Sequence, residues 1–241
     1  MTRKSPRSTW LSLGLLALGL ALGLPAPGLA SGGGGGGDMG GGSMGGEMRR
    51  AKPKTPAELA QASYASGLAH RDRALAFEAK AAVSDTSWLG KPPSEKAVDQ
   101  WRAAVTDYET AIETKRSFHE AHSDLGFALR KLGDYAASLA AYDKALELSP
   151  DYTPAIEYRG EAYLRLGRLE DGKQAYMRLF TLDRPLAAQL LGEMQKWLAE
   201  AEAKPAAGIS AEALAQFRTW VAERSQLAAQ SGQDLSDARS W

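Results

Sequence analysis

Cysteine is missing from all 241 residues of this sequence, and its absence excludes several kinds of chemistry. The chain can form no disulfide, offers no thiolate to a metal or a substrate, and has no cysteine for lipid attachment. Histidine is also scarce, with three in the chain, so a zinc site of three imidazole ligands would need every one. The stability of the fold must therefore come from the packing of apolar side chains.

A large net charge of either sign is absent as well. The chain has 29 basic and 29 acidic residues, and three of the basic ones, Arg3, Lys4 and Arg7, stand at the N-terminus. Without these three, 26 basic residues remain against 29 acidic ones, a formal charge of −3. This balance provides no long-range attraction to nucleic acid or to an anionic membrane, so neither is expected as a partner.

The N-terminus has the pattern of a secretory signal peptide. The basic residues precede an apolar stretch from Leu11 to Leu24, which is followed by two prolines and the small-residue sequence Gly28-Leu29-Ala30. About 14 apolar residues are fewer than the roughly 20 that a membrane-spanning helix needs, which makes an uncleaved anchor the lesser alternative. We predict a signal peptide over residues 1–30, cleavage near Ala30, and export to the periplasm or the medium.

Residues 31–54 form a glycine-rich arm. Glycine gains too little from packing to offset the entropy of ordering its backbone, so this arm is predicted to be a disordered tether. Met39, Met44 and Met48 interrupt the glycines, with Asp38 beside them. Thioether sulfurs are soft ligands that suit copper, which leaves copper binding by the arm as an alternative function.

The rest of the sequence predicts helices. Alanine, leucine, glutamate and arginine dominate, apolar residues recur every three or four positions, and no run alternates with the period of two typical of strands. We predict an all-α domain with helices over residues 57–82, 95–115, 119–131, 135–148, 153–165, 169–182, 186–203 and 211–229. An inserted loop is expected over residues 83–95, and a disordered tail over residues 231–241.

An internal repeat of 34 residues appears when residues 119–152 are laid over residues 153–186. The matched positions are Gly126 with Gly160, Leu132-Gly133 with Leu166-Gly167, Tyr142 with Tyr176, and Leu148 with Leu182. Two consecutive blocks with the same glycines, leucines and tyrosines indicate a repeated helical hairpin.

This repeat resembles that of the tetratricopeptide repeat family, and the chain is identified as an exported bacterial member of the family. The positions of the first block that carry the resemblance are His122 in the opening aromatic place, Leu125-Gly126, Leu129, Ser138, Tyr142 and Pro150. The second block departs more, because Arg159 replaces a leucine and Gly172 takes the small position. Glycine inside a helix costs about 1 kcal/mol relative to alanine, so this second repeat is expected to be the looser one.

Further hairpins are implied on either side of these two repeats. Ala104, Tyr108 and Ala111 have the spacing of a second repeat helix, which predicts a degenerate first hairpin over residues 55–118. Residues 187–230 are then expected to be capping helices, as end repeats commonly are. The implied fold is an all-α, right-handed superhelical α-solenoid of helix-turn-helix hairpins.

The resemblance also implies a binding site, because the first helix of each hairpin lines the concave groove in this family. The residues placed there are Glu120, Ser123, Phe127, Arg130, Lys131, Glu157, Glu161, Leu164 and Arg165. Glu157 and Glu161 are four residues apart, so their carboxylates share one helical face and are expected to contact a basic or amphipathic segment. The alternative is that these side chains form an ordinary solvated helix surface.

One specificity known in the family is not expected here. Some members bind a terminal carboxylate through lysine and asparagine in the groove. Ser123, Phe127, Glu157 and Glu161 stand where those residues are needed.

Other candidate sites carry less support. His119 and His122 share a helical face but lack further ligands, so no metal site is predicted, and no cofactor either. Without a nucleophile or a phosphate-binding loop, the chain is not expected to be an enzyme. Trp88 in the inserted loop either packs over the helices or anchors a partner. The expected function is a scaffold outside the cytoplasm that binds a protein or peptide during envelope assembly or transport.

Overall fold

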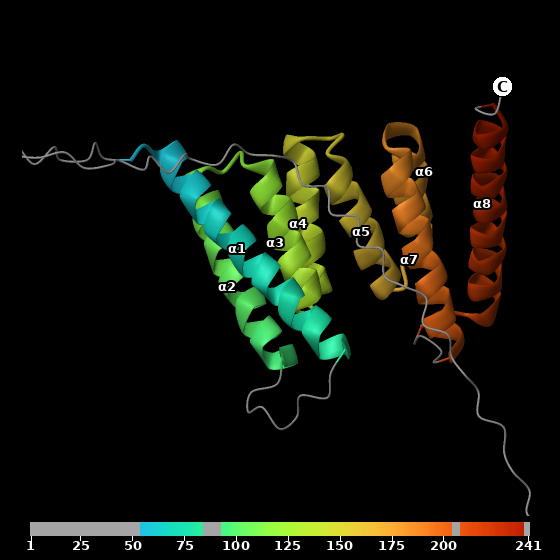
Figure 1. The fold of residues 1–241 in the computed structure, drawn as a ribbon, viewed down its shortest axis with the longest axis horizontal. Coiled ribbons are helices and arrows are strands. Elements are labelled where there is room, and N and C mark those ends of the chain that lie inside the picture. Colours follow the sequence, from blue (N-terminus) through green and yellow to red (C-terminus); the bar gives the residue numbers. More distant parts are fainter. Residues whose placement is uncertain (1–53, 84–92, 204–207, 239–241) are drawn as a thin grey trace, which may run out of the picture. The chain divides into compact units, whose positions relative to one another are not determined.

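The computed structural model describes residues 54–83, 93–203 and 208–238, all within one compact unit that spans residues 51–241. This part of the chain contains α-helices and no strand, and the helices follow one another in chain order (Figure 1). They are α1 (Pro56–Val83), α2 (Pro93–Thr114), α3 (His119–Lys131), α4 (Tyr135–Leu148), α5 (Thr153–Arg165), α6 (Leu169–Leu182), α7 (Arg184–Ala203) and α8 (Ala211–Ala238). The predicted signal peptide, the glycine run of the arm and the loop with Trp88 lie outside the described residues.

Helices α3 to α6 begin and end at the predicted residues because local signals mark their ends. Gly133 and Gly167 follow α3 and α5 with φ angles of 85° and 71°, a left-handed conformation that glycine adopts without strain and that ends a helix. The carboxylate of Asp134 accepts a hydrogen bond from the backbone N–H of Ala137 at 3.0 Å and so caps the start of α4.

The last two helices differ from the prediction at their ends. α7 begins at Arg184 instead of residue 186, because Pro185 fits the first turn of a helix and Asp183 caps that turn. α8 continues to Ala238, through most of the segment that the sequence predicts to be a disordered tail. No proline interrupts this segment, and its single glycine costs about 1 kcal/mol, too little to end a helix.

A contact between glycine and tyrosine recurs in the first two hairpins. A Cβ atom added to Gly126 of α3 would lie 2.6 Å from the Tyr142 ring of α4, and one added to Gly67 of α1 would lie 2.5 Å from the Tyr108 ring of α2. The helices approach this closely because glycine has no side chain. The pair α1–α2 therefore has the same construction as the pair α3–α4, and its helices are longer.

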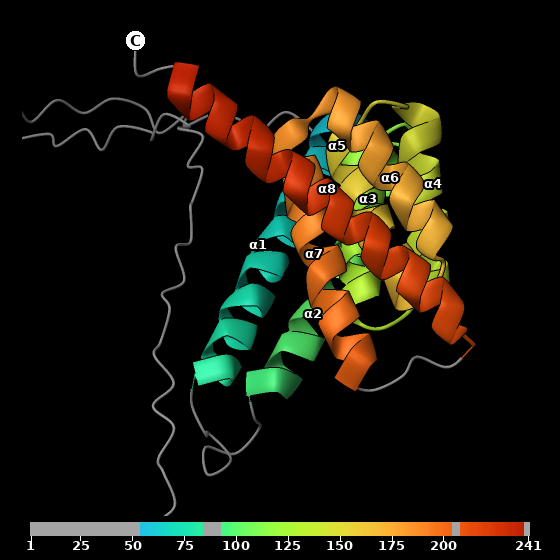
Figure 2. The ribbon, with the colours of Figure 1, turned by 90° about the vertical axis from the view of Figure 1, so that its right-hand side faces the viewer.

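The third pair, α5–α6, is completed by the helices that follow it. A Cβ atom on Gly160 of α5 would meet Leu190 of α7, with 2.7 Å to Leu190 Cδ2. Tyr176 of α6 packs edge-on against Trp220 of α8, and their ring centroids are 5.3 Å apart. Figure 2 shows α8 running obliquely across α6 and α7. α7 and α8 thus cover the end of the second repeat, and Phe217 of α8 is fully buried there.

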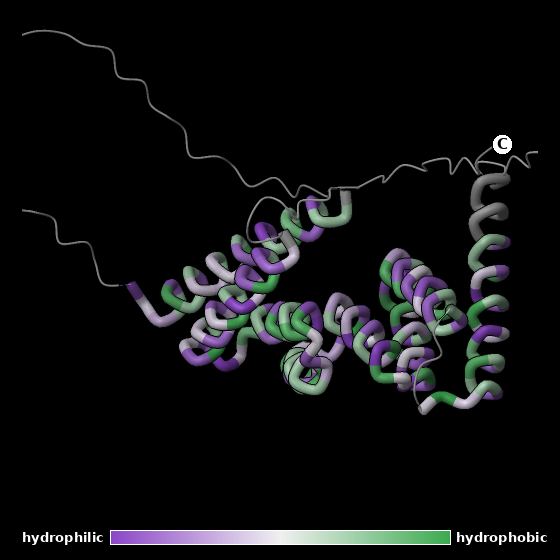
Figure 3. Tube along the Cα trace, turned by 90° about the horizontal axis from the view of Figure 1, so that it is seen from below, coloured by the Kyte–Doolittle hydropathy of each residue, from purple (hydrophilic) through white to green (hydrophobic). Residues whose placement is uncertain are grey.

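Apolar and polar residues are interspersed along the helices, so a helix buries one side and exposes the other (Figure 3). The buried side chains form one large cluster over α4 to α8 and smaller ones over α1 to α3. Of the helices described, none is long and apolar enough to cross a membrane. The architecture is an all-α solenoid of helical hairpins whose first helices lie next to one another.

Candidate partner-binding surface

The first helices of the three hairpins, α1, α3 and α5, carry side chains that contact one another from helix to helix. Their partly exposed residues form what we call the first-helix face: Tyr64, Arg71, Asp124, Phe127, Arg130, Lys131, Tyr158 and Glu161. This face combines aromatic rings with charges of both signs.

Aromatic rings form a row across the first-helix face. Phe127 of α3 lies edge-on to Trp101 of α2, with ring centroids 5.5 Å apart, and 4.8 Å from the ring of Tyr158 on α5. The Arg130 guanidinium lies over Phe127 at 5.1 Å and over Tyr158 at 5.7 Å. The ammonium of Lys131 is 5.8 Å from the Trp101 ring. Both cations are therefore stabilised by ring faces as well as by carboxylates.

Ion pairs join α1 to α3, α3 to α5, and α5 to α7. They are Arg71 with Asp124 at 3.6 Å, Arg130 with Glu161 at 2.5 Å, and Arg165 with Glu200 of α7 at 2.5 Å. The middle pair is the least exposed, with 11% and 17% of its side chains accessible. Solvent therefore screens this pair least, and it is the strongest electrostatic link between α3 and α5.

Glu157 is buried, so the prediction that it lines an accessible groove is wrong. Its side chain has no accessible surface, and neither carboxylate oxygen has a hydrogen-bond partner among the described residues. Burial, and next the adjacent carboxylate of Glu161, raise the pKa of Glu157 to about 9. Glu157 is therefore protonated at neutral pH, and the two expected carboxylates carry a single negative charge.

Two more of the predicted residues, Ser123 and Leu164, are also buried. Their assignment to a groove followed from their place in the repeat, whereas their burial depends on the neighbouring helices, including α7, which packs against α5. A partner could reach them only if helices separated. The other predicted residues are at least partly exposed: Glu120, Phe127, Arg130, Lys131, Glu161 and Arg165.

Four residues of the first-helix face were not predicted: Tyr64, Arg71, Asp124 and Tyr158. The Tyr64 hydroxyl donates a hydrogen bond to Asp124 Oδ2 at 2.6 Å, and burial raises the pKa of Asp124 despite this bond. A signal for Tyr64 exists, because aligning Gly67 with Gly126 places Tyr64 on the position of Ser123. No repeat position identifies Asp124, whose role comes from the contact with α1.

The histidines of α3 have structural partners. Of the residues described, no three histidine, aspartate or glutamate side chains gather as metal ligands would. His119 Nδ1 lies 3.2 Å from a carboxylate oxygen of Glu120, and His122 Nε2 lies 3.1 Å from the backbone oxygen of Arg116. Burial lowers the pKa of His122, so its ring is neutral at pH 7. The methionines considered as copper ligands lie outside the described residues.

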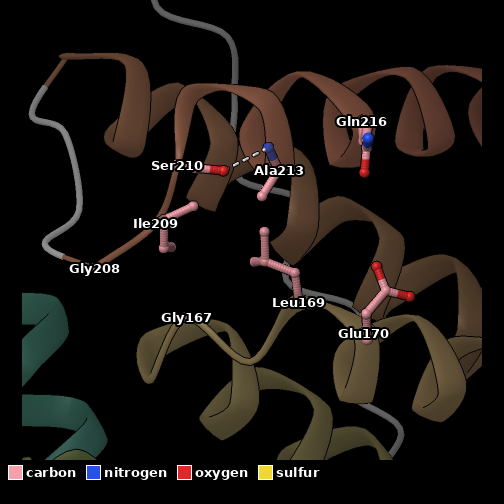
Figure 4. Close-up of a pocket in the computed structure, with 8 residues that line it drawn as sticks. All are labelled: Gly167, Leu169, Glu170, Gly208, Ile209, Ser210, Ala213 and Gln216. Carbon is pink, nitrogen blue, oxygen red and sulfur yellow. Dashed lines mark hydrogen bonds between the residues drawn. The ribbon is translucent and has the colours of Figure 1, made fainter.

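Two cavities adjoin the helices of the second repeat. One of about 310 Å³ lies between the Gly167 turn and the start of α8 (Figure 4). Its polar groups serve helix ends and a surface pair: Ser210 Oγ accepts a hydrogen bond from the backbone N–H of Ala213, and Glu170 pairs with Lys173. A much smaller cavity of about 10 Å³ lies between α5 and α7. The smaller cavity is lined by Glu161, Leu164, Arg165, Glu193 and Trp197.

Residues 119–152 and residues 159–185 each match a family model for the tetratricopeptide repeat. A comparison with curated protein sequences found no match. The two matched segments correspond to the two blocks of the 34-residue period.

Solved structures with a similar fold include three tetratricopeptide domains. The domain of Arabidopsis OM64 has a TM-score of 0.45 and 17% identity, and the alignment covers 59% of this chain and 98% of that one. The first TPR of Spaghetti (RPAP3), bound to the HSP90 peptide SRMEEVD, has a TM-score of 0.40 and 18% identity, with 56% and 95% covered. The first TPR domain of human RPAP3 has a TM-score of 0.39 and 21% identity, with 55% and 97% covered.

Proposed function

This chain belongs to the tetratricopeptide repeat family, and from that premise we propose that it binds a segment of another protein on the first-helix face. Repeats of this kind generally serve as interaction scaffolds, because stacked hairpins provide an extended surface. The observation that carries the proposal is the row of partly exposed rings, Phe127 and Tyr158, set among charges of both signs.

These rings are suited to hold a peptide. Aromatic side chains offer a large apolar area and lose little conformational entropy when a partner covers them. Phe127 and Tyr158 are positioned before any partner arrives, because Arg130 lies over both rings and Glu161 holds Arg130. Preorganised side chains reduce the entropic cost of binding.

The charges of the face argue against recognition of a terminal carboxylate. Arg130 is paired with Glu161, and Lys131 is paired with Glu78 at 2.6 Å. A carboxylate would have to displace Glu161 or Glu78 from its cation, whereas a partner's cation is attracted by these same carboxylates. We therefore propose a partner segment that combines an apolar side chain with a basic one.

Selection of random 12-residue peptides on the chain from residue 31 onward tests the proposal. Selected peptides should bind at least tenfold more weakly, about 1.4 kcal/mol, when Phe127→Ala or Tyr158→Ala removes a ring. Met177→Ala is the control, because Met177 is 46% exposed on α6, outside the first-helix face. Equal binding to all three variants would show that the peptides use another surface.

We also propose that the chain acts outside the cytoplasm, in envelope assembly or transport, after cleavage near Ala30. The basic N-terminus, short apolar stretch and small-residue end support this location. Sequencing the N-terminus of the chain recovered from the periplasm should give Ser31 as the first residue. A chain that remains in the cytoplasm and starts at Met1 would contradict the proposal.

A further inference from the structure

The Glu157 carboxyl group is enclosed by charged and titratable side chains from several helices. Arg130 comes from α3, Tyr158 and Glu161 from α5 itself, and Glu193 from α7. On the other helices packed against α5, α4 brings the buried Tyr142, and Tyr176 is the titratable side chain among the buried residues of α6. Arg130 is thus the one cation among the groups that act most strongly on Glu157.

Arg130 has hydrogen-bonding capacity that its present partner does not use. Its Nη1 donates to Glu161 Oε2 at 2.5 Å, while its Nε is buried and has no partner among the described residues. Both oxygens of Glu157 are equally without partners. A guanidinium has five N–H donors in a planar fork, so Arg130 is able to serve either carboxylate.

The two carboxylates differ in their access to solvent. Glu161 is 17% accessible and lines the small cavity between α5 and α7, whereas Glu157 has no accessible surface. Glu193 lines the same cavity from α7, and its partner Lys196 is 69% exposed. A cation that approaches from outside therefore meets Glu161 and Glu193, with the ring of Trp197 beside them.

We propose that a lysine or arginine side chain of the bound partner pairs with the exposed part of the Glu161 carboxylate, beside the small cavity between α5 and α7, and that Arg130 then moves to Glu157, which releases its proton to solvent. This inference rests on the proposed function, because the partner segment delivers the cation. Two ion pairs then replace one, and the buried orphan oxygens of Glu157 gain a donor.

The exchange makes binding depend on pH in a defined direction. In the free protein burial and the neighbouring carboxylate raise the pKa of Glu157 to about 9, so this group is protonated at pH 7. Pairing with Arg130 lowers its pKa in the complex, so binding releases one proton between the two pKa values. Affinity should therefore rise with pH, by up to tenfold per unit, from neutrality to about pH 9.

The test uses the most enriched peptide from the selection above that contains a single lysine, and the same peptide with that lysine replaced by glutamine. Isothermal calorimetry at pH 7 in phosphate and in Tris, two buffers with different ionisation enthalpies, counts the protons released. We expect close to one proton for the lysine peptide and none for the glutamine peptide, which should also bind at least tenfold more weakly.

Three variants separate the roles of the carboxylates. Glu161→Gln should weaken the lysine peptide at least tenfold, because the cation loses its partner. Glu157→Gln should abolish both the proton release and the rise of affinity with pH. Glu200→Gln is the matched control, because Glu200 forms the exposed pair with Arg165, and it should leave the proton count unchanged.

The outcomes separate a failure of the exchange at Arg130 from a failure of the proposed binding face. If peptides bind through Phe127 and Tyr158 but release no proton, or release it equally from Glu157→Gln, the exchange at Arg130 is wrong and the binding face stands. If no peptide depends on the two rings, the binding face is wrong and the exchange falls with it.

Discussion

At the scale of single residues, Glu157 links the fold to pH. An ordinary glutamate titrates near 4.5, while burial and the Glu161 carboxylate hold the pKa of Glu157 in the folded chain at about 9. Between these values the folded state binds a proton that the unfolded state lacks. The bound proton therefore favours the folded state. Its contribution to the free energy of unfolding is fully present below pH 4.5 and is lost as pH rises toward 9.

The variant Glu157→Gln should therefore be more stable than the native chain at pH 8 and little different at pH 5. Each pKa unit corresponds to about 1.4 kcal/mol, and the amide has no proton to lose as pH rises. We expect an increase of about 1–3 kcal/mol in the free energy of unfolding at pH 8, measured by urea denaturation. Equal effects at both pH values would show that Glu157 titrates normally.

Two glycines should respond to alanine in opposite directions. At Gly126 a Cβ atom would lie 2.6 Å from the buried Tyr142 ring, so Gly126→Ala must push apart α3 and α4. At Gly192, inside α7, no atom lies within 4 Å of the added Cβ. We expect Gly126→Ala to lower the free energy of unfolding by about 1–3 kcal/mol and Gly192→Ala to raise it by about 0.5–1 kcal/mol. Thermal unfolding of both variants measures these changes. Stabilisation by both would mean that α3 and α4 do not pack this closely.

At the scale of helices, the sequence predicted the ends best where a single residue decides them. Gly133 and Gly167 stop α3 and α5 through their positive φ angles, and Asp134 caps α4, so these boundaries could be read directly. The end of α8 was missed because nothing there forces a stop, and the weak signals of Gly232 and the polar residues favoured a tail.

The candidate site was harder to predict than the helices that carry it. Phe127 and Arg130 could be placed on this face from the resemblance of the repeat to the tetratricopeptide family, in which the first helix of each hairpin lines the groove. The burial of Glu157 could not, because it depends on how α7 and α3 close against α5, and no position within one repeat encodes the neighbour. Tyr64 bonds to Asp124 across 60 positions of chain, a contact that helical periodicity does not indicate.

At the scale of the whole molecule, contacts run mainly between helices that are neighbours in the solenoid. Stability in such an array is approximately a sum over repeats and the interfaces between them. The end of the array needs a cover, because the second repeat would otherwise expose apolar side chains. α8 supplies it: Phe217 packs edge-on against Trp197 at 5.7 Å, and Trp220 packs against Tyr176.

Ending the chain after Ala203 should therefore destabilise the helices next to α8 and spare the other end of the array. Removal of α8 takes away Phe217 and Val221, both buried, and uncovers Trp197. Each large apolar side chain contributes about 1.5–3 kcal/mol, so we expect a loss of about 3–6 kcal/mol. Hydrogen exchange should accelerate in α6 and α7 far more than in α1 and α2, whose buried clusters are separate.

A chain that ends after Gln230 is the control for this truncation, because it retains Phe217 and Val221, the α8 residues that the structure describes as buried. It should unfold within about 0.5 kcal/mol of the full chain. If ending the chain after Ala203 accelerated exchange in α1 and α2 as much as in α6 and α7, the array would unfold as one cooperative block instead of repeat by repeat. If neither changed exchange in α6 and α7, α8 would not be the cover that its aromatic contacts indicate.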